Sequence, residues 1–210
     1  MIDWSEYAKF FIGLLAIVNP IGIVPVFMGL TRHLSAPERS TVGLRAAITV
    51  GMVLVVALLM GEALLSFFGI SLDSFRDAGG ILILLMAIIM LHVGISPAKQ
   101  TSEEAQDAEE KESIAVVPLG MPLLAGPGAI STIIIYSHRG DDVAHYALLF
   151  SIAVVLALLT WLALRAAPAI ADRLGRTGLN IVTRIMGLIL AAIGVEFMAN
   201  GLRQLFPGLG

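Results

Sequence analysis

The stretch that decides the fold is Val117-Pro118-Leu119-Gly120-Met121-Pro122-Leu123-Leu124-Ala125-Gly126-Pro127-Gly128-Ala129-Ile130-Ser131-Thr132. It carries no charge and therefore suits the hydrocarbon of a membrane, yet its three prolines and three glycines prevent one regular helix. In lipid, the backbone groups freed by such breaks need partners inside the protein or in a wet cavity. The stretch therefore predicts a broken membrane helix at a binding site, with a kinked helix that binds nothing as the alternative.

A second broken apolar stretch lies near the N-terminus: Ile17-Val18-Asn19-Pro20-Ile21-Gly22-Ile23-Val24-Pro25-Val26-Phe27. Proline interrupts it twice. Apolar segments that are broken at corresponding places in two halves of a chain are typical of transporter sites. The pair predicts that the protein is organised in two halves around these segments.

The composition indicates an integral membrane protein. Of the 210 residues, 58% are hydrophobic and 14% are charged, whereas soluble domains are about 25% charged. The chain has no cysteine, so we expect no disulfide and no thiolate metal site, and we expect no metal, cofactor or nucleic acid. The first residues lack the basic region of a signal peptide, so we expect the first apolar segment to be retained.

Six segments are long and apolar enough to cross a bilayer, which requires about 20 residues per helix. They lie at about 8–31, 42–68, 75–95, 114–137, 143–167 and 181–204. Lysine and arginine favour the cytoplasmic side. Nine lie beside the loops after the first, third and fifth segments, namely Arg32, Arg39, Arg45, Lys99, Lys111, Arg165, Arg173, Arg176 and Arg184. Four lie on the opposite side, namely Lys9, Arg76, Arg139 and Arg203. The bias predicts that both termini face outward.

The acidic stretch 96–113 is the only long polar part of the chain, and we interpret it as a solvated cytoplasmic linker. It divides one membrane domain, 1–210, into repeats at 1–95 and 114–210. A shift of 107 residues supports the repeats, because it superimposes the pairs Gly13 and Gly120, Pro20 and Pro127, Arg32 and Arg139, Gly80 and Gly187, Ala87 and Gly194, and Gly94 and Gly201. With three helices in each half, the two repeats must cross the membrane in opposite senses. The fold prediction is therefore an all-α membrane protein with six transmembrane helices in two inverted three-helix repeats, whose first and fourth helices are broken at proline and glycine.

Two rows of small residues recur every seven positions. Gly80, Ala87 and Gly94 form one row in the third segment, and Gly187, Gly194 and Gly201 form the other in the sixth. Small residues allow membrane helices to approach one another closely. We expect each row to contact a broken helix, with general helix packing as the alternative.

Four motifs carry a resemblance to a known family. They are Asn19-Pro20-x-Gly22-x-x-Pro25-x-Phe27, Ala78-Gly79-Gly80-Ile81, Pro118-Leu119-x-x-Pro122-Leu123-x-Ala125-Gly126-Pro127-Gly128-x-Ile130 and Arg184-x-Met186-Gly187-Leu188-Ile189-Leu190. In this order, along essentially the whole chain, the sequence resembles the MarC family of bacterial inner-membrane proteins. Asp77 departs from the pattern, which has a neutral residue before Ala78.

The resemblance implies an inner-membrane protein that transports small neutral amino acids such as glycine and alanine. The family is also grouped with exporters of the LysE type, so the resemblance leaves the direction of transport open. It provides no set of ligand residues for this chain. Its partners would be the lipid bilayer, the small substrate and a coupling ion, either H⁺ or Na⁺.

The broken segments offer partners for a zwitterion. A half-helix that begins near Gly126 and Gly128 presents free N–H groups and a positive dipole end to a carboxylate. A half-helix that ends near Asn19 presents carbonyls, and the Asn19 amide, to an ammonium. The predicted substrate-binding residues are Asn19, Pro20, Gly22, Gly126, Gly128, Ser131 and Thr132, with repair of the broken backbone as the alternative role for each.

Glu62 and Glu196 are the candidates for coupling-ion binding, because acidic residues inside membrane segments are often functional. Interfacial placement or a structural hydrogen bond is the alternative. The chain has no G-x-S-x-G, H-E-x-x-H or P-loop motif, so we predict no enzyme and no catalytic residue. A membrane scaffold that transports nothing, or an exporter of other small molecules, remains the alternative to an amino-acid transporter.

Overall fold

The structure is a computed structural model that describes residues 4–92, 124–140 and 142–206. Its elements are the helices α1 (Trp4–Val18), α2 (Val24–Leu30), α3 (Ala36–Phe67), α4 (Leu72–His92), α6 (Pro127–Ser137) and α7 (Val143–Leu205). Within these residues the regular structure is helical throughout, as predicted. The predicted linker, 96–113, and the first part of the segment 114–137 lie outside the described residues, so the division into two repeats stays a prediction.

Within the residues that the structure describes, four helical stretches are long and apolar enough to cross a membrane. They are α3, α4 and the two limbs of α7, Val143–Gly175 and Thr177–Leu205. The predicted second segment begins earlier than its apolar residues suggest, because the Ser35 backbone N–H donates to the Glu38 carboxylate at 2.9 Å and starts α3 at Ala36. Hydropathy therefore locates the part of a helix that suits lipid, and capping residues locate its end.

The predicted connection between the fifth and sixth segments is present, but it is a bend at a single residue rather than a loop. α7 stays helical from Val143 to Leu205 except at Gly175, where φ is 60° and ψ is −177°. A side chain would be strained in this conformation, whereas glycine adopts it readily. Gly175 alone therefore reverses the direction of the chain, where the polar sequence around Arg173 predicted a loop.

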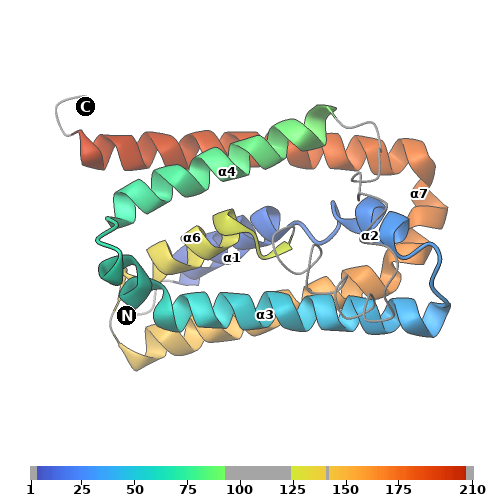
Figure 1. The fold of residues 1–210 in the computed structure, drawn as a ribbon, viewed down its shortest axis with the longest axis horizontal. Coiled ribbons are helices and arrows are strands. Elements are labelled where there is room, and N and C mark those ends of the chain that lie inside the picture. Colours follow the sequence, from blue (N-terminus) through green and yellow to red (C-terminus); the bar gives the residue numbers. More distant parts are fainter. Residues whose placement is uncertain (1–3, 93–123, 141, 207–210) are drawn as a thin grey trace.

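The helices form three layers (Figure 1). α3 and the first limb of α7 make one outer layer, and α4 and the second limb make the other. The short helices α1, α2 and α6 lie between them, and α6 contacts α3 on one side and α4 on the other. The broken segments thus occupy the centre of the molecule.

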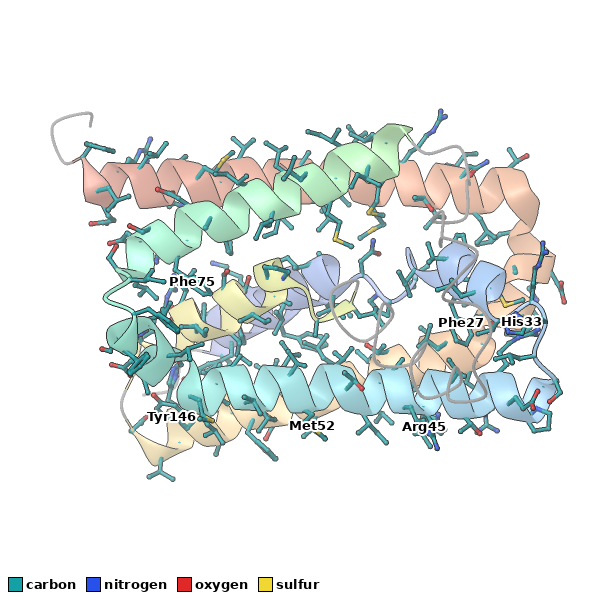
Figure 2. The ribbon with its side chains drawn as sticks, viewed as in Figure 1. Phe27, His33, Arg45, Met52, Phe75 and Tyr146 are labelled. Atoms are coloured by element: carbon teal, nitrogen blue, oxygen red, sulfur yellow. The ribbon has the colours of Figure 1, made fainter. Side chains whose placement is uncertain are left out.

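The two ends of this arrangement are distinct. The end at which α1 begins and α6 and α7 end is called the termini face, and the opposite end, at which α2 ends and α7 bends back, is called the hinge face. Between the two faces many large apolar side chains are exposed, among them Met52, Leu59, Ile89 and Leu188. Figure 2 shows Met52 pointing outward from α3, while Phe27 lies fully buried between α2 and α3. An exposed apolar belt of this kind suits lipid.

The rows of small residues face each other and do not contact the broken helices, so that prediction is wrong. A Cβ added to Gly80 on α4 would lie 2.8 Å from the Gly194 carbonyl oxygen on α7. A Cβ added to Gly187 would lie 3.2 Å from the carbonyl oxygen of Ala87. The two antiparallel helices approach so closely that their backbones touch, which is the packing that small residues permit in membranes. Gly94 lies outside the described residues.

Candidate functional site

The first break follows directly from Pro20. This residue has no N–H to donate to the carbonyl of Ala16, so α1 ends at Val18. Asn19 adopts a left-handed conformation with φ of 48°, which asparagine tolerates better than most residues. The chain then turns, and α2 begins at Val24 with Pro25 in its first turn. The predicted break in the first segment is confirmed.

The Asn19 side chain repairs this break. It is buried, and its Oδ1 accepts the Gly22 backbone N–H at 3.0 Å. Its Nδ2 donates to the Met90 sulfur on α4 at 3.9 Å, which is a weak bond. One of the two lone pairs of the oxygen that we expected to hold a substrate ammonium is therefore already in use. Gly22 is needed here because a Cβ would collide with the Asn19 side chain; Pro20 is buried within the same turn.

The second break places the start of α6 at Pro127, as predicted. Gly126 is its N-cap, in an extended conformation with φ of −74° and ψ of 174°, and it contributes no side-chain cap. Its carbonyl oxygen accepts the N–H groups of Ala129 and Ile130 at 3.0 and 3.1 Å. The N–H of Gly128 follows a proline in the first turn, where helical N–H groups have no partner within their own helix. Gly128 is buried, and a Cβ there would collide with Ile83 of α4.

The two predicted hydroxyls serve the backbone of α6. Ser131 Oγ donates to the Pro127 carbonyl at 2.7 Å, and Thr132 Oγ1 donates to the Gly128 carbonyl at 2.6 Å. Both side chains are buried. These bonds are the usual way for a helical serine or threonine to satisfy its hydroxyl. These bonds match the alternative raised by the sequence, backbone repair, and substrate binding by either hydroxyl stays a prediction.

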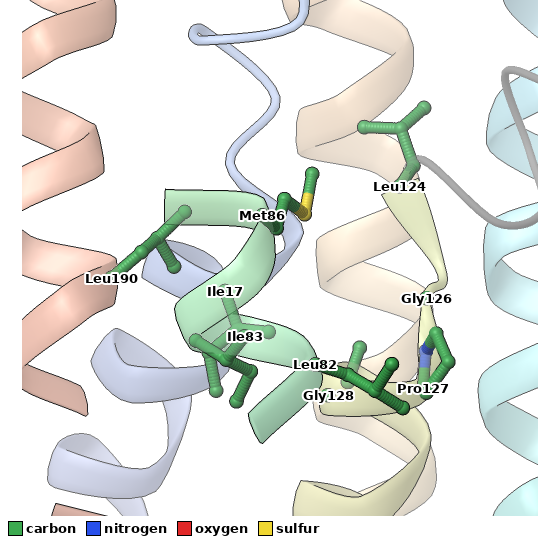
Figure 3. Close-up of a pocket in the computed structure, with 10 residues that line it drawn as sticks. Ile17, Leu82, Ile83, Met86, Leu124, Gly126, Pro127, Gly128 and Leu190 are labelled. Atoms are coloured by element: carbon green, nitrogen blue, oxygen red, sulfur yellow. The ribbon is translucent and has the colours of Figure 1, made fainter. Parts of the chain in front are cut away.

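A cavity of about 40 Å³ lies where the two breaks meet (Figure 3). Its walls come from the last turn of α1, the start of α6, α4 and the second limb of α7. They comprise Ile17, Leu82, Ile83, Met86, Leu124, Gly126, Pro127, Gly128, Ala129 and Leu190. Every lining side chain is apolar, so backbone groups at the two helix ends are the polar partners that these residues offer.

The coupling candidates lie apart from this cavity. Glu62 is exposed near the end of α3, with its Oε1 3.9 Å from His138 Nδ1 at the termini face. Glu196 is exposed on α7, where its Oε1 accepts the Asn200 side-chain amide at 3.1 Å. The structure does not bring either carboxylate to Asn19 or Gly128. Among the described residues no three His, Asp or Glu side chains gather as metal ligands would.

Sequence reasoning missed the aliphatic walls of the cavity. Ile17, Ile83, Leu124 and Leu190 are all buried there. The shift of 107 residues carries Ile17 onto Leu124 and Ile83 onto Leu190. This signal was present in the sequence, but aliphatic pairs are too common in membrane helices to stand out from it.

Comparison with known proteins agrees with the motifs. A family model described as "MarC family integral membrane protein" matches residues 4–206. The UPF0056 membrane protein YhcE of Escherichia coli is 44% identical over 99% of this chain and 96% of its own length. YvbG of Bacillus subtilis is 38% identical over 98% of both chains, and MJ1677 of Methanocaldococcus jannaschii is 41% identical over 96% of this chain and 98% of its own length. No solved structure matches. The chain belongs to the MarC family of integral membrane proteins.

Proposed function

We propose that this protein is a secondary transporter of small neutral amino acids such as glycine and alanine, which works by alternating access around the cavity at the two breaks. One observation carries the proposal. Ile17, in the last turn of α1, and Gly128, in the first turn of α6, line the same cavity. A helix C-terminus, which attracts cations, and a helix N-terminus, which attracts anions, therefore meet at one place.

This pairing of helix ends suits a zwitterion. The substrate carboxylate is assigned to the N–H of Gly128, and Gly128 allows close approach because it has no side chain. The ammonium is assigned to the carbonyls at the end of α1, including that of Ala16, which Pro20 deprives of its usual donor. Asn19 is assigned a positioning role, since it holds the turn that exposes these carbonyls.

The aliphatic walls support a preference for short side chains. A cavity of about 40 Å³ has room for a few water molecules. An amino acid requires α4, which provides Ile83 and Met86, to move away from α6. The closed arrangement is consistent with one stage of an alternating-access cycle, in which the outer layer formed by α4 and the second limb of α7 moves against the central helices.

The contacts of α4 with α7 support two inverted repeats as the basis of this cycle. Gly80 packs on Gly194, and Ala87 packs on Gly187. The shift of 107 residues converts the first pair into the second, with the partners exchanged, as a two-fold axis requires. Ile83 and Leu190, which the same shift relates, lie midway along this contact and line the cavity. The proposed axis passes close to the proposed site.

Uptake of labelled glycine and alanine into proteoliposomes tests the function. The purified chain is expected to accelerate uptake over empty liposomes, and excess unlabelled alanine is expected to compete. Efflux from preloaded vesicles under the same conditions determines the direction. If neither amino acid moves in either direction while the protein is folded and inserted, the protein is a membrane scaffold or an exporter of other small molecules.

The coupling ion is tested in the same vesicles. Uptake driven by an imposed H⁺ or Na⁺ gradient identifies the ion, and Glu62→Gln and Glu196→Gln test the two candidate carboxylates. Loss of gradient-driven uptake, with exchange of substrate retained, is expected for the residue that binds the ion. If both variants keep gradient-driven uptake, coupling resides elsewhere.

We also propose that the hinge face is cytoplasmic in the bacterial inner membrane. Arg32 and Arg39 lie at the connection from α2 to α3, and Arg173 lies beside the bend at Gly175, in agreement with the positive-inside bias. Both termini would then lie on the periplasmic side. Reporter fusions at Gly210 are expected to be active in the periplasm, and a fusion active only in the cytoplasm would overturn the orientation.

A further inference from the structure

The wall that α4 contributes to the cavity is uneven. Three of its side chains line the cavity, namely Leu82, Ile83 and Met86. Leu82 is 42% exposed and Met86 is partly exposed, whereas Ile83 is only 3% exposed. Figure 3 shows Ile83 beside Ile17 of α1. Ile83 is therefore the α4 side chain that packs most completely against the two breaks.

Ile83 fills the space beside the first turn of α6. A Cβ added to Gly128 would collide with Ile83 Cγ1, and it would lie 2.8 Å from Ile83 Cδ1. The same Cβ would lie 3.4 Å from Cγ2 of Ile17, in the last turn of α1. The end of α1, the start of α6 and the Ile83 side chain therefore meet at Gly128.

The assigned helix ends determine where a bound side chain points. The substrate carboxylate is assigned to the N–H of Gly128, and the ammonium is assigned to the carbonyls at the end of α1. In an α-amino acid these two groups and the side chain leave one carbon atom in different directions. The side chain therefore faces the opposite wall, which α4 and the second limb of α7 provide through Ile83, Met86 and Leu190. Of these three, Ile83 lies nearest to Gly128.

Ile83 and Met86 differ in how they respond to a larger ligand. Isoleucine is branched at Cβ, which leaves its side chain one strongly preferred conformation in a helix. Methionine is unbranched and has three rotatable bonds, so it adapts to irregular spaces. A larger substrate side chain can therefore displace Met86 by bond rotation, whereas it meets a fixed obstacle at Ile83.

We propose that Ile83 is the specificity-determining residue of the site, and that it limits the substrate side chain to about one carbon atom. The inference rests on the proposed function and adds to it the residue that excludes larger neutral amino acids such as valine. Ile83 is fixed on α4 and keeps its direction toward α6 when that helix moves as a unit. The size limit therefore applies in the substrate-bound state as well.

Binding of an amino-acid series to the full chain in lipid nanodiscs tests the proposal. Glycine, alanine, 2-aminobutyrate and valine, whose side chains increase by one carbon at each step, are titrated separately by calorimetry. In the unmodified protein the affinity is expected to fall steeply beyond alanine. In Ile83→Ala the affinity for valine relative to glycine is expected to rise at least about tenfold, which is the lower range for one methylene in an apolar pocket.

Two further variants accompany this measurement. Ile81→Ala removes the same atoms from an exposed position of α4 and is expected to keep the selectivity of the unmodified protein. Ile83→Val removes a single methyl group, so it tests the proposal even if Ile83→Ala does not fold. Its selectivity is expected to be intermediate, with 2-aminobutyrate gaining more affinity than valine.

The ratio of affinities separates selectivity from a general loss of packing, which would weaken the binding of all four ligands in parallel. If the valine-to-glycine ratio is unchanged in the folded Ile83 variants, or if the unmodified protein already binds valine as well as alanine, Ile83 does not set the size limit. Either result leaves the proposed function intact. If the unmodified protein binds neither glycine nor alanine, the proposed function is wrong and this inference falls with it.

Discussion

The two helix breaks are repaired in different ways. At the first break, the side chain of Asn19 bonds the Gly22 N–H, and this turn is buried. At the second break, Gly126 caps α6 through its backbone alone and supplies no side-chain acceptor. The first break is thus held by a side chain, whereas at the second the N–H of Gly128, a residue that lines the cavity, is left without a side-chain cap. In the proposed mechanism the first break positions the site, and the second binds the substrate carboxylate.

The largest effect is expected at Gly128, in the open break. Gly128→Leu should abolish glycine and alanine uptake, because the new side chain takes the space between Ile83 and the start of α6. Gly13→Leu is the matched control, since a Cβ at Gly13 meets no atom within 4 Å. Normal uptake by a folded Gly128→Leu protein would place the site elsewhere.

A smaller substitution tests whether a side chain at position 128 collides with Ile83. Gly128→Ala should destabilise the protein by about 1–3 kcal/mol through overpacking against Ile83. Adding Ile83→Ala should recover part of this stability, as measured by thermal unfolding in detergent. If Ile83→Ala restores no stability to Gly128→Ala, contact with Ile83 is not the cause of the destabilisation.

Asn19→Ala should destabilise the turn at the first break, with a smaller effect on the affinity for substrate. Loss of the buried bond to Gly22 is expected to reduce the free energy of unfolding by about 1–3 kcal/mol. The left-handed backbone conformation at position 19 costs alanine a further free energy of about 1 kcal/mol, and glycine does not bear this cost. Asn19→Gly should therefore be the more stable of the two variants. If Asn19→Ala keeps its stability but requires much more substrate, Asn19 binds the substrate directly.

Gly126→Ser would make the second break resemble the first. A serine at the N-cap accepts an N–H from the first turn, and the expected gain in stability over glycine is a few tenths of a kcal/mol. Uptake should fall at the same time, because the hydroxyl competes with the substrate carboxylate for the Gly128 N–H. Gly126→Ala, which offers no acceptor, is the control. Unchanged uptake by Gly126→Ser would mean that these N–H groups do not bind substrate.

The smallest effect is expected at Ser131. Its hydroxyl satisfies only the Pro127 carbonyl of its own helix, so Ser131→Ala should change stability by no more than about 0.5 kcal/mol. Uptake kinetics should be close to those of the unmodified protein. A large rise in the substrate concentration for half-maximal uptake would show that the hydroxyl binds substrate in an open state.

Local chemistry explains which features were predictable. The break at Pro20 and the start of α6 at Pro127 follow from a missing N–H, a property of one residue. The partner of the small-residue rows depends on which helices meet, and nothing in the period of Gly80 and Ala87 specifies this. The role of Asn19 depends on a single backbone angle that places its side chain over Gly22. The contact between Tyr7 and His145 joins residues 138 positions apart, so no local pattern could reveal it.

Gly175 has a consequence for how the chain is made. A straight helix of the 63 residues of α7 would be roughly 95 Å long, about three times the thickness of the hydrocarbon layer. Insertion into a bilayer therefore requires the helix to bend back, and in the structure the bend lies at Gly175. Arg173 and Arg184 flank the bend with charges that resist entry into lipid. A side chain at position 175 is expected to move the bend along α7. The second limb would then be misaligned with α4 during insertion, before the cavity can form.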